Sequence, residues 1–284
     1  MRPVSVFKKN YRIELRDVDL TKKLKLSALF NYMQEISSLH VENLGTGIEA
    51  IEKRCGVTWI LMRAKAEIAR YPSWNEDITI ETWQQKPKHF EFERDFIVRD
   101  ATGNVIIRVV SIWIIIDIKT RELKGTESIA VQYPPFFEER AMTNFRLRKI
   151  KPFEHTKIAY KKKIGYSDTD INGHINNAKY IDFATDCFPV EQHMQYFIKS
   201  MQINYIREAI PGDNLVFYTD ISDLNSNMVY IGGIKEEIGA PIFSTVVEIV
   251  PVKEYEELIT FPHHHPGHMD CTEIPPPEDE ELKR

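Results

Sequence analysis

The chain repeats one structural plan in its two halves, and this repeat limits the folds that are open to it. Each copy starts with a strand-like stretch, residues 11–17 and 160–168, that leads into an Asp-x-Asp pair. A helical segment with apolar residues at three- and four-residue spacing follows in each copy. Runs rich in β-branched and aromatic residues complete each half. One helix followed by several antiparallel strands, present twice, predicts a tandem α+β protein in which each sheet wraps its own helix.

The expected helices and strands can be placed along the chain. The apolar helix positions are Leu26, Leu29, Phe30 and Met33 in the first copy, and Ala178, Ile181 and Phe183 in the second. The strand-like runs cover residues 78–84, 90–100 and 105–118, then 201–208, 214–222, 227–236 and 241–252. Turn signals such as residues 100–104 and 224–227 separate these runs.

Changes in composition suggest the domain boundaries. The segment 126–153 contains Pro134, Pro135 and a run of charges, which is typical of an interdomain linker. We therefore expect an N-terminal domain at residues 1–148 and a C-terminal domain at residues 153–260. Residues 261–284 are rich in His, Pro and acidic side chains, so this stretch cannot bury much apolar surface and is expected to be a flexible tail.

Composition excludes several classes of protein. Hydrophobic residues make up 43% and charged residues 28% of the 284 residues, which is typical of a soluble globular protein. The longest apolar run covers only residues 112–116, and a membrane helix needs about 20. No secretory signal is visible, so a cytoplasmic location is the default expectation. The net charge of -5 argues against a general nucleic-acid binder.

Cysteine and histidine give no evidence of a metal site or a cofactor. Cys55, Cys187 and Cys271 are an odd number with no metal-like spacing, so we expect no disulfide framework. The histidines between residues 263 and 268 lie in the Pro-rich tail, where adventitious binding is the simpler interpretation. We therefore predict no metal and no cofactor.

The densest polar cluster of the chain covers residues 167–177, just before the second helix. Helix capping explains one or two of its Ser, Asp and Asn residues. It does not explain why Asp170, Asn172 and His174 stand at every second position, with Gly173 allowing a tight turn. An acid, an amide and an imidazole at this spacing indicate a catalytic loop.

Comparison of the two halves points to a single active site. When Asp19 is aligned with Asp170, Thr21 stands opposite Asn172 and Lys23 opposite His174. The first copy therefore lacks the candidate acid–base group, although drift of a purely structural loop would look similar.

A second candidate carboxylate is Glu208, which ends a probable strand. When Pro72 is aligned with Pro211, Ala69 stands opposite Glu208, so the first copy lacks this group too. A surface glutamate paired with Lys or Arg is the alternative interpretation.

At these residues the sequence resembles the acyl-acyl carrier protein thioesterases of plants and bacteria. Residues 167–180 meet the plant motif S-D-x-D-x-N-x-H-x-N-N-x-K-Y at every named position. Tyr205, Arg207 and Glu208 meet the start of the motif Y-x-R-E-C, and the similarity extends over about residues 5–255. The resemblance implies tandem hotdog domains, a role in fatty acid biosynthesis and lipid metabolism, and hydrolysis of fatty acyl-acyl carrier protein to free fatty acid.

One departure from the family pattern bears on the mechanism. Ala209 stands where the plant motif has a Cys that an older view treated as a nucleophile. Cys187 lies downstream in the helix, where packing is the better interpretation. The resemblance then implies a carboxylate-centred site built from Asp170, Asn172, His174 and Glu208.

The family's chemistry suggests a role for each group. The thioester carbonyl would point at the N-terminus of the central helix, near Asn176 or Asn177. Glu208 or Asp170 would deprotonate or orient water, or Asp170 would attack directly. Asn172 would hold the carboxylate or the water, and His174 would donate a hydrogen bond and carry the proton.

The first half is expected to hold the acyl chain. The candidate lining residues are Met33, Ile36, Leu39, Val41, Trp59 and Leu61, each of which could equally be plain core. The acidic carrier protein could be steered by basic residues near the site, among them Lys161, Lys162, Lys163, Lys179 and Arg207.

Alternative functions remain open at the level of the sequence. The nearest is an acyl-CoA thioesterase with the same fold and site. A hotdog hydratase is disfavoured because its Asp-x-x-x-x-His-Gly arrangement is missing, and a non-catalytic acyl-binding protein is disfavoured by the full set of candidate catalytic residues. One tandem chain can satisfy the pairing of hotdog domains, yet two chains can still associate as a homodimer.

Overall fold

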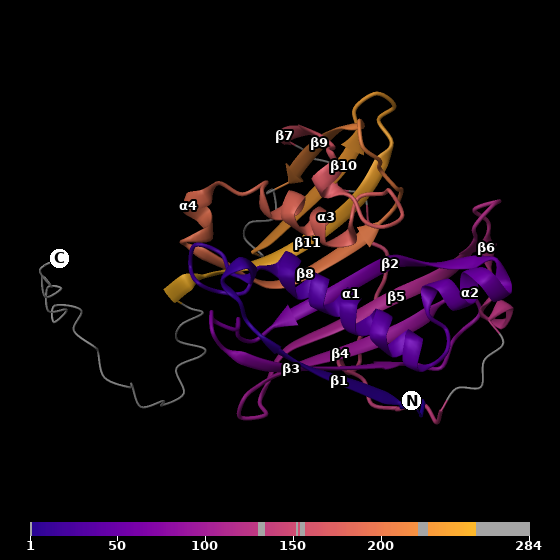
Figure 1. Ribbon diagram of the computed structural model, residues 1–284. Helices are drawn as coiled ribbons and strands as arrows, with labels where there is room; N and C mark the ends of the chain where they lie inside the picture. The colour runs from indigo at the N-terminus through magenta and orange to yellow at the C-terminus, as the bar shows by residue number, and fades with distance from the viewer. Residues whose placement is uncertain (1, 130–133, 152, 154–156, 221–226, 254–284) are drawn as a thin grey trace, which may run out of the picture.

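One large antiparallel sheet carries two main helices on the same face (Figure 1). The computed structural model describes residues 2–129, 134–151, 153, 157–220 and 227–253, and the strands among them form an 11-stranded sheet. Its order is β1-β3-β4-β5-β2-β8-β11-β10-β9-β7, with β6 paired to β5. The strands of the first half are β1 (Val6–Arg12), β2 (Val57–Ile68), β3 (Asp77–Gln84), β4 (Phe92–Asp100), β5 (Val105–Asp117) and β6 (Leu123–Lys124). Those of the second half are β7 (Lys157–Lys163), β8 (Tyr196–Tyr205), β9 (Asn214–Asp220), β10 (Met228–Lys235) and β11 (Pro241–Pro251).

The helices match the repeated plan. The described α-helices are α1 (Leu26–Asn43), α2 (Ile48–Cys55), α3 (Asn177–Thr185) and α4 (Val190–His193). The apolar residues that predicted α1 and α3 are all buried, and they join one core cluster that runs through both halves. The predicted α+β class with antiparallel sheet around the helices is therefore confirmed.

The starts of the two copies differ from the prediction in their bounds. The opening strands lie earlier than residues 11–17 and 160–168, and they end at Arg12 and Lys163. Each is followed by a short 3-10 helix, Leu15–Asp17 and Tyr166–Asp168. The same hydrogen bond ends the strand early in both copies. The carboxylate of Asp17 or Asp168 accepts from the backbone N–H three residues earlier, which closes a turn.

The two halves share their sheet, which the repeat alone did not predict. Strand β2 pairs with β5 on one side and with β8 of the second half on the other, in register from Arg63↔Asn204 to Glu67↔Ser200. Sequence analysis had not predicted β2 as a strand and had started β8 at residue 201 instead of Tyr196. Charged residues alternate with apolar ones along residues 63–68, which is the period of a strand with one buried face.

The segment between the halves lies against the face of the sheet opposite α1. Ala141 and Met142 are buried in a cluster with Trp83, whose indole N–H donates to the Glu139 carbonyl at 2.8 Å. The expected domain limits at residues 148 and 153 stay predictions, as do the turn at 224–226 and the tail at 261–284, which lie outside the described residues. No helix in the described part of the chain combines the length and the apolar composition that a membrane crossing requires.

Candidate active site

The candidate catalytic loop predicted within residues 167–177 forms a tight turn. Asp170 N–H donates to the His174 carbonyl at 2.8 Å, and Gly173 N–H donates to the Asp170 carbonyl at 3.1 Å. Gly173 has φ +74°, in the left-handed region that glycine adopts without strain. The Asp170 carboxylate accepts from the backbone N–H groups of Asn172 at 2.8 Å and His174 at 3.4 Å. The loop therefore presents Asn172 and His174 on one side.

The first copy builds the same turn without the candidate catalytic groups. Asp19 N–H donates to the Lys23 carbonyl at 2.9 Å, and the Asp19 carboxylate accepts from the N–H of Thr21 at 2.8 Å. The alignment of Asp19 with Asp170 is thus confirmed. Since Asp19 makes these bonds in a copy that lacks the imidazole, part of the role of Asp170 is structural.

The hydrogen bonds correct the second internal alignment. Equivalent backbone hydrogen bonds occur after β2 in the first copy and after β8 in the second. Arg70 N–H donates to the Ile106 carbonyl as Arg207 N–H donates to the Ile242 carbonyl. Asn75 N–H donates to the Ile13 carbonyl as Gly212 N–H donates to the Ile164 carbonyl. These pairs place Tyr71, not Ala69, opposite Glu208, so aligning Pro72 with Pro211 was wrong by two residues. The inference that the first copy lacks the carboxylate is unaffected, because Tyr71 has none.

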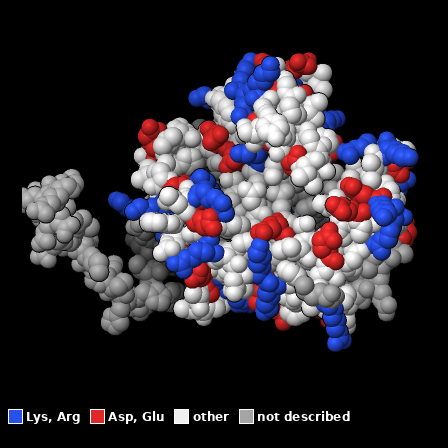
Figure 2. Space-filling model, viewed as in Figure 1, with Lys and Arg blue, Asp and Glu red and all other residues white. Residues whose placement is uncertain are grey.

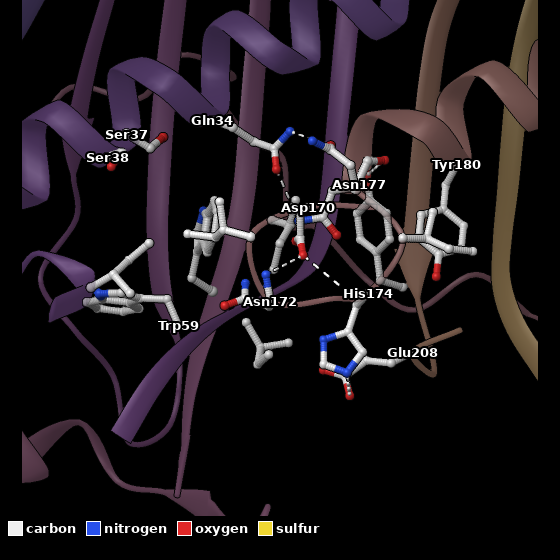
Figure 3. Close-up of a pocket in the computed structure, with 18 of the residues that line it drawn as sticks. Gln34, Ser37, Ser38, Trp59, Asp170, Asn172, His174, Asn177, Tyr180 and Glu208 are labelled. Carbon is white, nitrogen blue, oxygen red and sulfur yellow. Dashed lines mark hydrogen bonds and ion pairs between the residues drawn. The ribbon is translucent and has the colours of Figure 1, made fainter. Parts of the chain in front are cut away.

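Glu208 lies beside His174 (Figure 3). Its Oε2 is 3.4 Å from His174 Nε2, and its Oε1 pairs with the guanidinium of Arg121 from the turn between β5 and β6 of the first half. His174 is 31% and Glu208 39% exposed at the side chain, so water can reach both. This is the pairing of carboxylate and imidazole that general acid–base chemistry uses.

All four candidate catalytic residues line one cavity of about 490 Å³. The candidate catalytic residues are at one end of the cavity. Trp59 of β2 lies farther from His174 and Glu208, in the direction in which α1 runs (Figure 3). The cavity crosses from the second half into the first, between α1 and the strands of the shared sheet. Its other lining groups include Val41, Trp59, Ile60, Leu61, Phe92 and Trp113.

The predicted acyl-chain residues divide into two groups. Trp59, Leu61 and Val41 line the cavity as expected, and so do Asn176 and Asn177. Met33 and Ile36 do not, because they are buried in the core cluster, and Leu39 does not, because it is exposed on the surface. The α1 residues that line the cavity are Gln34, Glu35, Ser37, Ser38 and Val41. The polar and small residues that interrupt the apolar pattern of α1 were the signal for this face, and sequence analysis missed it.

The N-terminus of α3 reaches the cavity and is held by both halves. Asn176 caps the helix, since its Oδ1 accepts from Ala178 N–H at 2.8 Å. The Gln34 side chain of α1 donates to Asn176 Oδ1 at 3.2 Å and accepts from Asn177 Nδ2 at 3.3 Å (Figure 3). The Tyr205 hydroxyl donates to the Asn177 carbonyl at 3.1 Å. A helix N-terminus fixed in this way offers N–H groups and a favourable dipole to developing negative charge.

Neither of the described cysteines, Cys55 and Cys187, lines the cavity. Burial, with a smaller effect from Asp186, raises the pKa of Cys187 to about 12, and its thiol donates to the Phe183 carbonyl at 3.4 Å. Cys187 is not part of the cavity wall, Cys55 ends α2, and Ala209 is fully buried. Burial also raises the pKa of Tyr180 and Tyr205, so these cavity residues stay neutral phenols.

The described residues contain no group of three or more His, Cys, Asp or Glu side chains that could hold a metal ion. The histidines at 263–268 lie outside the part of the chain that the structure describes.

Comparison with known proteins identifies the family. The sequence profile of the acyl-ACP thioesterase N-terminal domain matches residues 4–130, and that of the C-terminal domain matches residues 151–240. The chain belongs to the acyl-ACP thioesterase family. Among curated relatives, the oleoyl-acyl carrier protein thioesterase 2 of Arabidopsis thaliana is 28% identical over 224 residues, which cover 73% of this chain and 60% of that protein. The palmitoyl-acyl carrier protein thioesterase of Gossypium hirsutum is 26% identical over 239 residues, covering 80% of this chain and 58% of that protein.

Solved structures of acyl-ACP thioesterases support the fold. One from Bacteroides thetaiotaomicron is 24% identical with a TM-score of 0.72, covering 87% of this chain and 98% of that one. The 12:0-ACP thioesterase of Umbellularia californica is 21% identical with a TM-score of 0.74, covering 87% and 94%. The tandem hotdog fold is thereby confirmed. The chain spans about 60% of the length of the curated relatives named above.

Proposed function

We propose that the chain hydrolyses the thioester of fatty acyl groups carried on acyl carrier protein. The observation that carries the proposal is the pairing of His174 with Glu208 at 3.4 Å, at one end of a cavity of about 490 Å³ with a largely apolar wall. A thioester placed there would have its carbonyl at the N-terminus of α3 and its acyl chain in the first half. The relatives named as oleoyl- and palmitoyl-acyl carrier protein thioesterases support this substrate class.

The geometry favours Glu208 as the base. One oxygen of Asp170 is already bound by two N–H groups of its own loop, whereas Glu208 Oε2 faces His174. Glu208 would take a proton from water, and the water oxygen would attack the carbonyl carbon. The N–H of Asn177, in the first turn of α3, would stabilise the oxyanion. The C–S bond then breaks. His174 donates its ring proton to the departing thiolate and regains a proton from Glu208, which gives a free fatty acid and a thiol and restores both side chains.

Asp170 and Asn172 would support this step as positioning groups. Asp170 holds the loop that carries His174, and Asn172 lines the cavity beside it. In this proposal the N-terminal half, about residues 1–148, holds the chain and the C-terminal half, about residues 153–260, carries the chemistry.

Docking of the carrier protein would not depend on a single basic patch. Figure 2 shows Lys and Arg interspersed with Asp and Glu on this face. Three lysines that were expected to steer the carrier have acidic partners, since Lys161 pairs with Glu236, Lys162 with Asp168 and Lys179 with Asp182. The cytoplasmic location, the absence of a cofactor and the homodimer remain predictions from the sequence.

The test measures release of fatty acid from acyl-carrier substrates of graded chain length. His174→Ala and Glu208→Gln should each lower turnover by at least ~100-fold, as expected when an acid–base group is removed. Ala209→Cys, at a buried position next to Glu208, should leave the rate unchanged and serves as the control.

Two outcomes would contradict the proposal. The site is wrong if both variants hydrolyse acyl-carrier substrate at the wild-type rate. The substrate class is wrong if acyl-CoA is hydrolysed with a much higher kcat/KM than the acyl carrier protein thioester of the same length.

A further inference from the structure

The cavity wall includes two buried polar side chains that the proposed hydrolysis does not use. Gln84 is the last residue of β3 and Arg94 lies on β4, and the two are direct partners in the register of the sheet. Both line the same cavity as the catalytic residues, yet Gln84 is only 5% and Arg94 only 3% exposed. Groups of this kind are unexpected along the path of a plain hydrocarbon chain.

Gln84 is the more informative of the two. Its Nε2 is buried and has no hydrogen-bond partner among the described residues. Buried polar groups are almost always hydrogen-bonded, because an unsatisfied one is destabilising. An amide that lines a cavity and lacks a partner therefore points to a ligand that supplies the missing oxygen or hydrogen.

Arg94 is held in a fixed orientation beside Gln84. Its Nη1 donates to His40 Nδ1 at 2.8 Å and to Thr82 Oγ1 at 3.3 Å. The other ring nitrogen of His40 is 3.0 Å from the Val4 carbonyl, so it carries the ring hydrogen and donates it. Burial, reinforced by the charge of Arg94, lowers the pKa of His40 to about 4 and keeps the ring neutral. The site thus has fixed polar groups and is not an accidental surface cluster.

Gln84 and Arg94 lie well away from the thioester position. A continuous row of paired residues crosses the sheet from Gln84 through Arg94, Ser111 and Ala64 to Ile203. Ile203 is on β8, two residues before Tyr205, which holds the N-terminus of α3. Arg94 is three strand spacings from β8, roughly 14 Å, and Gln84 is one spacing further. These side chains would meet the distal part of an acyl chain and not its first carbons.

We propose that the cavity binds acyl chains that carry a hydroxyl group on their distal part, recognised by Gln84 with Arg94 beside it. This inference rests on the proposed function, whose substrate class it narrows. A hydroxyl can both donate and accept, so it satisfies the Gln84 amide in either orientation. It is also neutral, so it enters the cavity without the desolvation that a second buried charge would require.

The experiment compares acyl-carrier substrates of one chain length, either unsubstituted or with a hydroxyl at successive carbons from C3 to the end of the chain. For the wild type, kcat/KM should be about 3- to 10-fold higher for one distal position than for the unsubstituted chain, as expected for one hydrogen bond. Gln84→Leu should abolish this preference, so that kcat/KM is the same for the distal hydroxyl chain and for the unsubstituted chain.

A matched control makes the same exchange elsewhere in the sheet. Gln202→Leu on β8 alters a glutamine that is not part of the cavity wall and donates to the Arg148 carbonyl, so it should keep the preference. If Gln84→Leu does not fold, Gln84→Met provides the same apolar exchange with a more flexible side chain.

The inference is overturned if the wild type does not distinguish distal hydroxyl from unsubstituted chains, or if Gln84→Leu leaves the ratio unchanged. It is also overturned if a terminal carboxylate is preferred over a hydroxyl, because Arg94 would then be the recognition group. Failure of the proposed function is a separate outcome, in which the wild type hydrolyses none of the acyl-carrier substrates.

Discussion

At the residue scale, the candidate base Glu208 is shared between the halves. One carboxylate oxygen faces His174 of its own half, and the other pairs with Arg121, which the first half contributes from a turn. Arg121 has φ +62°, a conformation that few side-chain-bearing residues adopt. The turn itself is held by Asp117, whose carboxylate accepts from the N–H groups of Lys119 and Thr120. We infer that Arg121 orients Glu208 without contacting substrate.

Arg121→Ala should reduce kcat/KM only modestly, by up to about fivefold at low salt, because exposed ion pairs contribute little. The difference between variant and wild type should shrink in 0.5 M salt, since screening weakens the pair in the wild type. Steady-state kinetics at two ionic strengths measure both effects. Lys119→Ala in the same turn is the control, and a loss as large as that of His174→Ala would show that Arg121 takes part in the reaction directly.

At the scale of the elements, α1 and α3 begin at matched positions but are capped differently. Lys25 and Asn176 are the N-cap residues, and each donates its backbone N–H to the carbonyl of the matched aspartate, Asp17 or Asp168. Only Asn176 makes a side-chain cap bond, and only this helix end lines the cavity close to His174. The capped end is therefore the one that the proposed chemistry uses.

Asn176→Ala should lower the free energy of unfolding by about 1 kcal/mol, the usual effect of removing a side-chain N-cap. It should also lower turnover, because Gln34 loses one of its two partners at the helix end. Lys25→Ala at the matched position should change stability by no more than a few tenths of a kcal/mol. Urea unfolding of the three proteins measures this, and equal destabilisation by the two variants would contradict the assignment.

At the scale of the whole molecule, the β2–β8 pairing makes the two hotdog units one cooperative structure. The core cluster contains residues of both halves, including Ala66 of β2 and Met201 of β8, which are paired partners and fully buried. Such continuity predicts that neither half unfolds before the other.

Tryptophan fluorescence can test this prediction, because all four tryptophans lie between residues 59 and 113 of the first half. Urea midpoints from tryptophan fluorescence and from far-UV circular dichroism should coincide. Met201→Ala, in the second half, should lower the fluorescence midpoint as well, by an amount that corresponds to about 2–5 kcal/mol for a buried methionine. Two separated midpoints, or a fluorescence midpoint insensitive to Met201→Ala, would show that the halves unfold independently.

Local patterns predicted the repeat, the main helices and the tight loop around Asp170, because these depend on contacts close in sequence. The turn around Asp170 is specified by bonds within five residues, and its residues therefore read clearly in the sequence. The pairing of β2 with β8 and the ion pair of Arg121 with Glu208 join residues 87 or more positions apart in the sequence, and no local pattern encodes such contacts. The face of α1 that lines the cavity was misjudged for a different reason, because its local signal, the polar and small residues at positions 34, 35, 37 and 38, was not used.

The contacts that Gln34 and Arg121 of the first half make with Asn176 and Glu208 of the second half have a consequence for protein engineering. In the proposed function the second half carries out the hydrolysis and the first half binds the acyl chain. Residues of the first half, Gln34 and Arg121, nevertheless position Asn176 and Glu208 of the second half. A chimaera that joins the first half of one relative to the second half of another would inherit a mismatched junction. If the residues at positions 34 and 121 are exchanged together with the transplanted second half, the contacts to positions 176 and 208 would be restored.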